Sequence, residues 1–164
     1  MIFYLRYGGA ALVMLGALLV SRAYASYMKK RLSEYRGLER MIAHAEGEIS
    51  RFLAYGSELW RNFSDEAMEG CGLLSHLRDG KGISESFELS RDAMSLSASV
   101  KQKISDMLEP LGRGYKDDEV KLLSSIGDRL SEEISRESDE AEKNIRIARA
   151  LLIGGALAVV IMIV

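Results

Sequence analysis

Two histidines and one cysteine are the side chains of this 164-residue chain best suited to metal binding or nucleophilic chemistry. Either chemistry needs further polar groups that converge on the imidazole or the thiol. Cys71 and His76 are five residues apart on an expected helix, which places them on different sides of it, and His44 occupies a helix position that we expect to be exposed. No carboxylate spacing around them completes a metal triad. We therefore expect no catalytic residue, no metal site and no cofactor, and we interpret Cys71 as a small packing residue.

The residues present also disfavour phosphate binding and nucleic-acid binding. Gly80-Lys81-Gly82 lacks the long spacer of a phosphate-binding loop and the hydroxyl residue directly after the lysine. Adjacent acids such as Glu132-Glu133 are common in the chain, but acids on a helix usually form a solvated face. The net charge of -2 offers no basic face for a nucleic acid. We expect a protein that is not an enzyme and that binds neither nucleic acid nor a small-molecule substrate.

Both ends of the chain are apolar. Residues 7–21 carry no charge, and neither do residues 150–164. As helices, residues 2–20 and 147–164 would each span about 27–28 Å, which is enough to cross a bilayer core. Arg6 and Arg149 lie near the ends of these stretches, where an arginine can reach the headgroups. We predict transmembrane helices over residues 2–21 and 147–164, with a helical domain over residues 22–146.

The distribution of cations predicts the orientation of these spans. The cations next to the predicted spans, on the side of the intervening domain, are Arg22, Lys29, Lys30, Arg31, Arg36, Arg40, Lys143, Arg146 and Arg149. Beyond the first span there is only Arg6 with the terminal amine. The positive-inside rule therefore places the helical domain in the cytoplasm.

Two other interpretations of the apolar ends stay open. Ala23-Tyr24-Ala25 has the form of a signal-peptidase site, so the N-terminal segment could be a cleaved signal. Against this, the charge before the apolar stretch is weak and the charge after it is heavy. The last 15 residues are also short enough for a buried core helix, although their lack of any polar face favours lipid.

Helix is the only fold class that fits the part between the spans. The apolar residues of its first helix, which we expect to end near Tyr55, recur at alternating steps of three and four, at Tyr35, Leu38, Ile42, Ala45, Ile49 and Phe52. A last helix from Asp117 onward carries a similar stripe, at Val120, Leu123, Ile126, Leu130, Ile134, Ala141, Ile145 and Ala148. Because the first helix leaves the membrane and the last returns to it, the two should pack antiparallel. The predicted fold is an all-α antiparallel bundle between two transmembrane helices.

Three shorter helices are expected between the two long ones. The first should be capped by Ser64 and carry Met68, Cys71, Leu74 and Leu77; the second should start at Ser84 and carry Phe87 and Leu89; the third should carry Val100, Ile104 and Leu108. Breaks are expected at Gly56, at residues 80–82, at Pro110 and at residues 112–114.

Small residues suggest how the two membrane helices could pair. Gly9 and Gly16 are seven residues apart on one face of the first, and Gly154 and Ala158 are four apart on one face of the second. In lipid, small residues let helices approach closely. We predict that these faces pack together; the alternative is that they merely reflect the frequency of glycine in membrane helices.

Several short motifs occur in a characteristic order along the chain. They are Glu48-Ile49, Tyr55-Gly56, Lys81-Gly82-Ile83-Ser84 with Phe87, Leu111-Gly112 followed by Asp117, Lys143-Asn144, and Leu151-Leu152-Ile153-Gly154-Gly155. With the two apolar ends, their order and spacing resemble the stage III sporulation protein AB family of endospore-forming bacteria over essentially the whole chain. Ser57-Glu58 stands where the family usually has a proline-leucine pair, and Pro110 with Arg113-Gly114-Tyr115 replaces a more regular helix and turn.

The resemblance implies a role without catalysis. The family is similar to the soluble domains of platform proteins from type II secretion and type IV pilus machines. A member would lie in the mother-cell membrane surrounding the forespore, within a stage III complex that forms a channel or transport apparatus, and its cytoplasmic domain would contact the ATPase of the complex. Candidate contact residues are Asp117, Asp118, Glu119, Lys143 and Asn144.

Two other classes of function stay open. A membrane-tethered helical sensor would need a sensing region outside the membrane, where this chain has almost nothing. A membrane-bound hydrolase or thiol enzyme would need a third polar group beside Cys71 or His76.

Overall fold

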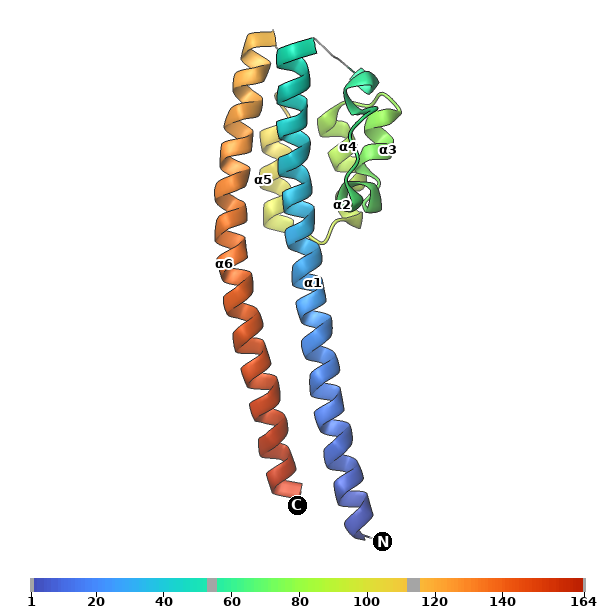
Figure 1. Ribbon diagram of the computed structural model, residues 1–164, viewed down its shortest axis with the longest axis vertical. Helices are drawn as coiled ribbons and strands as arrows, with labels where there is room; N and C mark the ends of the chain where they lie inside the picture. Colours follow the sequence, from blue (N-terminus) through green and yellow to red (C-terminus); the bar gives the residue numbers. More distant parts are fainter. Residues whose placement is uncertain (1, 53–55, 112–115, 164) are drawn as a thin grey trace. The chain divides into compact units, whose positions relative to one another are not determined.

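The computed structural model describes residues 2–52, 56–111 and 116–163 (Figure 1). Every element in the described residues is helical, which confirms the predicted all-α fold class. In chain order the elements are α1 (Ile2–Phe52), the 3-10 helix η1 (Gly56–Trp60), α2 (Glu66–Gly70), α3 (Leu73–Arg78), α4 (Ile83–Ser90), the 3-10 helix η2 (Arg91–Ala93), α5 (Ala98–Leu108) and α6 (Lys116–Ile163). The predicted end of the first helix near Tyr55, the predicted break at residues 112–114 and the Phe52 side chain lie outside the described part.

The chain forms two compact units. The paired-helix unit combines Met1–Lys29 with Glu137–Val164, and the globular unit is Lys30–Arg136. The predicted boundaries after residues 21 and 146 concern the edges of a membrane rather than these units, so they stay a prediction.

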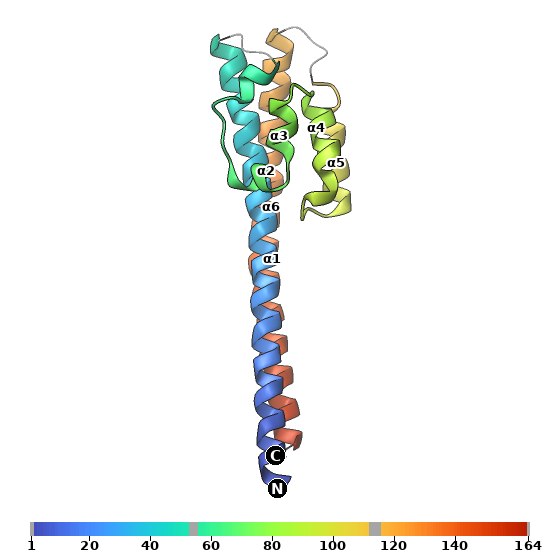
Figure 2. The ribbon, with the colours of Figure 1, turned by 90° about the vertical axis from the view of Figure 1, so that its right-hand side faces the viewer.

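In the paired-helix unit, the start of α1 and the end of α6 run antiparallel beside each other, so that the first turn of α1 and the last turn of α6 lie at the same end (Figures 1 and 2). Each helix turns one narrow, partly buried face inward. On α1 this face holds Gly9, Val13, Ala17, Ser21, Tyr24 and Met28; on α6 it holds Ala141, Ile145, Ala148, Leu152, Ala156 and Val160. Steps of three and four along both helices keep each face on one side. The predicted antiparallel pairing of the first and last helices is confirmed.

The outward faces of this pair are strongly apolar. Both α1 and α6 contain a stretch long and apolar enough to cross a membrane. None of the residues in the most apolar stretch of α1 is buried, and only 6% of those in α6 are. A core helix of a soluble protein would be mostly buried, so this exposure disfavours that interpretation of the C-terminal helix.

The globular unit is built around the rest of α1 and α6. The predicted α1 seam is buried at Tyr35, Leu38, Ile42, Ala45 and Ile49, and Met41 joins it. The α6 stripe is buried at Leu123, Ile126, Leu130 and Ile134. A Cβ atom added to Gly127 would lie 3.9 Å from Cγ2 of Ile42, so the two helices are in contact there. These two seams therefore form the centre of one core.

The short helices complete that core. In the globular unit α2 packs on α3, α3 on α4 and α4 on α5 (Figure 2). Their main buried side chains are Met68, Leu73, Leu74, Leu77, Phe87, Val100, Ile104 and Leu108. The α5 helix has the predicted buried residues, and it ends at Leu108, two residues before Pro110, as proline requires.

The first predicted short helix is wrong in two respects. The cap is Asp65 rather than Ser64, because the Asp65 carboxylate accepts from the amides of residues 67 and 68. The helix is also interrupted after Gly70, and α3 begins again at Leu73. Gly72 lies between them at φ +82, a left-handed conformation that suits glycine.

The second predicted short helix differs at its start and on one face. It begins at Ile83 with Gly82 as its N-cap, so Ser84 lies inside it. Phe87 is buried as predicted, but Leu89 is 53% exposed. Phe87 and Leu89 are two positions apart, and such positions on a helix do not share a face.

Candidate interaction site

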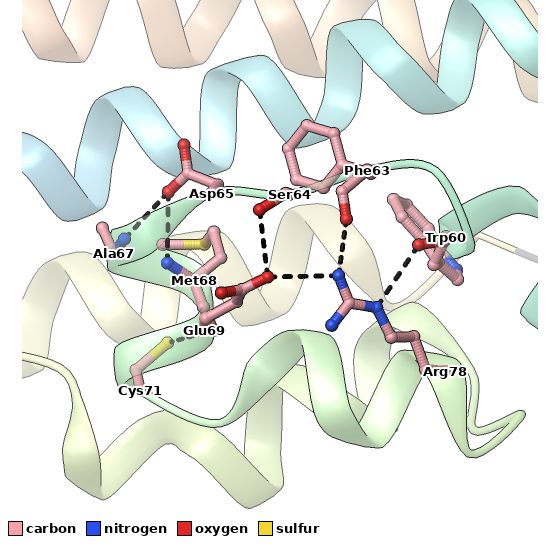
Figure 3. Close-up of polar contacts among 9 residues, drawn as sticks. All are labelled: Trp60, Phe63, Ser64, Asp65, Ala67, Met68, Glu69, Cys71 and Arg78. Carbon is pink, nitrogen blue, oxygen red and sulfur yellow. Dashed lines mark hydrogen bonds and ion pairs between the residues drawn. The ribbon is translucent and has the colours of Figure 1, made fainter.

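Asp65 is a buried carboxylate that joins the start of α2 to α1. Its Oδ1 atom accepts hydrogen bonds from the backbone amides of Ala67 and Met68, both at 3.1 Å (Figure 3). Its Oδ2 atom accepts from Arg40 on α1, at 2.9 Å from Nε. Because the Arg40 side chain is 54% exposed, solvent screens this ion pair, and its main effect is to position α2.

Gly37 makes room for this arrangement on α1. A Cβ atom at this position would lie 2.7 Å from Oδ1 of Asp65 and 2.9 Å from Cε of Met68. Both distances are shorter than van der Waals contact. The close approach of α2 to α1 therefore requires glycine here.

Arg78 on α3 holds the irregular segment between η1 and α2. Its Nη2 atom donates to the carbonyl of Phe63 at 2.7 Å and its Nε atom donates to the carbonyl of Trp60 at 3.5 Å (Figure 3). Nη2 also pairs with Glu69 at 3.2 Å, and Ser64 donates to the same carboxylate oxygen at 3.1 Å. A segment without regular backbone pairing thus gains side-chain partners for its carbonyls.

His44 is part of the same packing. The prediction that it occupies an exposed position is therefore wrong. Its Nε2 atom lies 2.9 Å from the carbonyl oxygen of Leu59, and its ring centroid lies 5.0 Å from that of Phe63. The Trp60 ring is 6.3 Å from it. The imidazole therefore anchors η1 to α1.

A pocket of about 150 Å³ opens beside η1 in the globular unit. Its walls include apolar side chains from four helices, Ile49, Trp60, Ile83 and Leu123. Two charged residues, Lys81 and Glu119, also line it. We call this hollow the Glu119 pocket.

Among the predicted contact residues, Glu119 differs most from the solvent exposure expected of a contact residue. It is only 8% exposed, whereas Asp117 and Asp118 in the same turn are exposed. The signal was present in the sequence, because Glu119 precedes Leu123 by four residues and so extends the buried α6 stripe by one turn. The predicted stripe begins one residue later, at Val120.

The other predicted contact residues lie elsewhere. Lys143 and Asn144 are exposed and belong to the paired-helix unit, whereas Asp117 and Asp118 belong to the globular unit.

The small residues predicted to pair the membrane helices are not gathered on the inward faces. Gly9 lies on that face of α1, but Gly16, Gly154 and Ala158 are exposed within the paired-helix unit. Among the described residues of this unit, the buried positions of α6 are instead Ala141 and Ala156.

Cys71 lies beside a second hollow, of about 310 Å³, that is also lined by Glu34. Its thiol donates to the carbonyl of Met68 at 3.4 Å. Burial raises the pKa of the Cys71 thiol, and the carboxylates of Glu34 and Asp65 raise it further. A thiol held protonated is a poor nucleophile, which disfavours the thiol-enzyme interpretation. In the described part of the chain, no three histidine, cysteine or acidic side chains are placed to hold a metal ion.

Comparison with known proteins gives the family. A family model described as stage III sporulation protein AB matches residues 6–164. The chain belongs to the stage III sporulation protein AB family. No curated protein and no solved structure matches it. Membership in the stage III sporulation protein AB family supports a role in sporulation as a member of the stage III complex, and the family is not one of known enzymes.

Proposed function

We propose that this chain is a non-catalytic platform component of a channel or transport complex between mother cell and forespore. Two apolar helices that bracket one compact helical unit carry this proposal. In the mother-cell membrane surrounding the forespore, they would hold the globular unit at the cytoplasmic surface, where it would contact the ATPase of the complex. A small helical unit tethered at both ends suits the organisation of contacts between other components.

Thiol labelling tests the proposed orientation. In a Cys71→Ala background, a cysteine in place of the exposed Ser125 should resist a membrane-impermeant maleimide in intact cells and react after lysis, because the cations predict a cytoplasmic globular unit. Met162→Cys, at the far end of the predicted second span, is the reciprocal control and should react in intact cells that produce the chain without sporulating, where that side of the membrane faces the medium. Labelling of the residue 125 cysteine in intact cells would reverse the assignment.

Co-purification tests the contact with the ATPase. A tagged full-length chain from sporulating cells should retain the ATPase, and Asp117→Lys with Asp118→Lys should reduce its recovery by about tenfold, because both exposed carboxylates become repulsive to a complementary basic surface.

Glu132→Lys is the matched control, since it reverses an exposed acid elsewhere on α6 and should leave recovery unchanged. Circular dichroism of each variant would check that α6 is intact, because acids in its first turn favour the helix. If the ATPase does not co-purify with the wild-type chain, the proposed contact between this chain and the ATPase is wrong.

A further inference from the structure

Exposed cations gather toward one end of the paired-helix unit. On α1 they are Arg22 and Lys29, and on α6 they are Lys143, Arg146 and Arg149. Because the two helices run antiparallel, these residues lie together toward the end of the unit opposite the first turn of α1 and the last turn of α6 (Figure 1). We call these residues the cation belt.

The order of residues along both helices separates the belt from acidic residues. On α1 the uncharged residues 7–21 are followed by the cations, and the first acid of the chain is Glu34. On α6 the uncharged residues 150–164 adjoin the cations of residues 143–149, and the nearest acids lie beyond them in residues 137–142. Both helices thus change from apolar to cationic to acidic in the same direction. Solvation by water does not require this order, whereas a negatively charged bilayer surface attracts cations and repels acids.

The depth of the belt matches that of a headgroup layer. At a rise of about 1.5 Å per residue, Arg22 to Lys29 covers about 10 Å of α1, and Lys143 to Arg149 covers about 9 Å of α6. The headgroup layer on each side of a bilayer is about 5–8 Å thick, and long cationic side chains can reach it from either edge. Tyr27 is 48% exposed at the same level, and tyrosine is enriched in this layer.

One acid lies close to the belt without neutralising it. An Nη2 atom of Arg146 lies 3.6 Å from a carboxylate oxygen of Glu142, one turn away on α6. The two side chains are 83% and 73% exposed, so solvent screens this pair and leaves both groups accessible. Residues 22–29 and 143–149 contain no acid, so the belt carries an excess of positive charge.

We propose that the cation belt binds the headgroups of anionic phospholipids in the leaflet that surrounds residues 22–29 and 143–149. Lysine and arginine side chains donate charge-assisted hydrogen bonds to phosphate, and each cation close to an anionic leaflet adds to the attraction. The inference deepens the proposed function by giving the class of lipid that the paired-helix unit gathers around it. It rests on that function only for the insertion of the two apolar helices into a membrane.

Electron spin resonance of labelled lipids provides the measurement. The full chain would be reconstituted at neutral pH in phosphatidylcholine vesicles that contain a trace of spin-labelled phosphatidylglycerol or of spin-labelled phosphatidylcholine. The fraction of motionally restricted label gives the relative association of each lipid with the chain. Phosphatidylglycerol should associate about twofold or more strongly than phosphatidylcholine at low salt. The preference should disappear in about 1 M NaCl, where the Debye length is about 3 Å.

Two variants test whether the belt carries this preference. Arg22→Gln, Lys29→Gln and Arg146→Gln together should remove most of it, since the long polar side chains stay and the charges go. Arg22→Lys, Lys29→Arg and Arg146→Lys together keep the charges and should retain it. Loss of the preference in both variants would assign it to the shape of the helix pair instead of its charge.

A matched control neutralises the same number of exposed cations in the globular unit. Arg61→Gln, Lys121→Gln and Arg129→Gln together change the net charge equally and should keep the preference. An equal loss in this control would assign the effect to net charge and overturn the role of the belt.

Two further outcomes would overturn the inference. One is equal association of the two lipids with the wild-type chain at low salt. The other is an unchanged preference after the three belt cations are replaced by glutamine. If either occurs while the ATPase still co-purifies with the wild-type chain, only the lipid inference is wrong. A preference for phosphatidylglycerol without recovery of the ATPase would instead remove the proposed contact and leave the lipid inference intact.

Discussion

Gly37→Leu should destabilise the globular unit by about 3 kcal/mol or more, because it overpacks a tight contact and disrupts a helix cap at the same time. The first side-chain atom would already lie 2.7 Å from the Asp65 carboxylate. That carboxylate cannot simply move away, since it accepts from two amides of α2 and from Arg40. The substitution must push α2 off α1.

A urea titration of the full chain followed by Trp60 fluorescence would measure this loss. The matched control is Gly47→Ala on the same helix, where a Cβ atom meets nothing within 4 Å. Alanine favours helix over glycine, so this control should raise the free energy of unfolding by about 0.5–1 kcal/mol. Equal stability of Gly37→Leu and the wild type would show that α2 does not pack closely on α1.

Leu130→Asp should also cost about 4 kcal/mol or more, which is a large part of the stability of a domain of this size. Leu130 is 2% exposed on the buried face of α6. The substitution removes a large apolar side chain from the core and buries a carboxylate without a partner.

Ser131→Asp introduces the same residue at the next position of α6, where the side chain is exposed. It should change the free energy of unfolding by less than about 0.5 kcal/mol. The two variants would be compared by the same urea titration. Similar unfolding midpoints for both would mean that Leu130 does not belong to the core.

The long helices could be predicted because their pattern is local. The α1 seam repeats at steps of three and four over several turns, and a run of that length has one structural explanation. Gly72 could not be assigned in the same way. A glycine inside an apolar pattern is compatible with a helix interior, as at Gly47, and with a left-handed break, and only the packing of α2 and α3 distinguishes them. The choice between Ser64 and Asp65 as cap also depends on where the chain enters α2.

The candidate site was harder to predict because its parts are distant in the sequence. Ile49, Ile83 and Glu119 come together only through the packing of α1, α4 and α6. In the sequence, Glu119 is an acid near a predicted helix start, where acids are common and usually exposed. Its burial becomes apparent only when the buried face of α6 is extended by one turn from Leu123 to Glu119.

The rate at which the buried Cys71 thiol is alkylated can report local opening of the globular unit. An alkylating reagent needs an accessible thiolate, and in the closed state burial restricts access to the Cys71 thiol and raises its pKa. Alkylation must therefore wait until α2 and α3 separate locally from α1. When reclosing is fast, the ratio of the alkylation rate to that of the unfolded chain equals the population of the opened state, so it measures the free energy of this local unfolding.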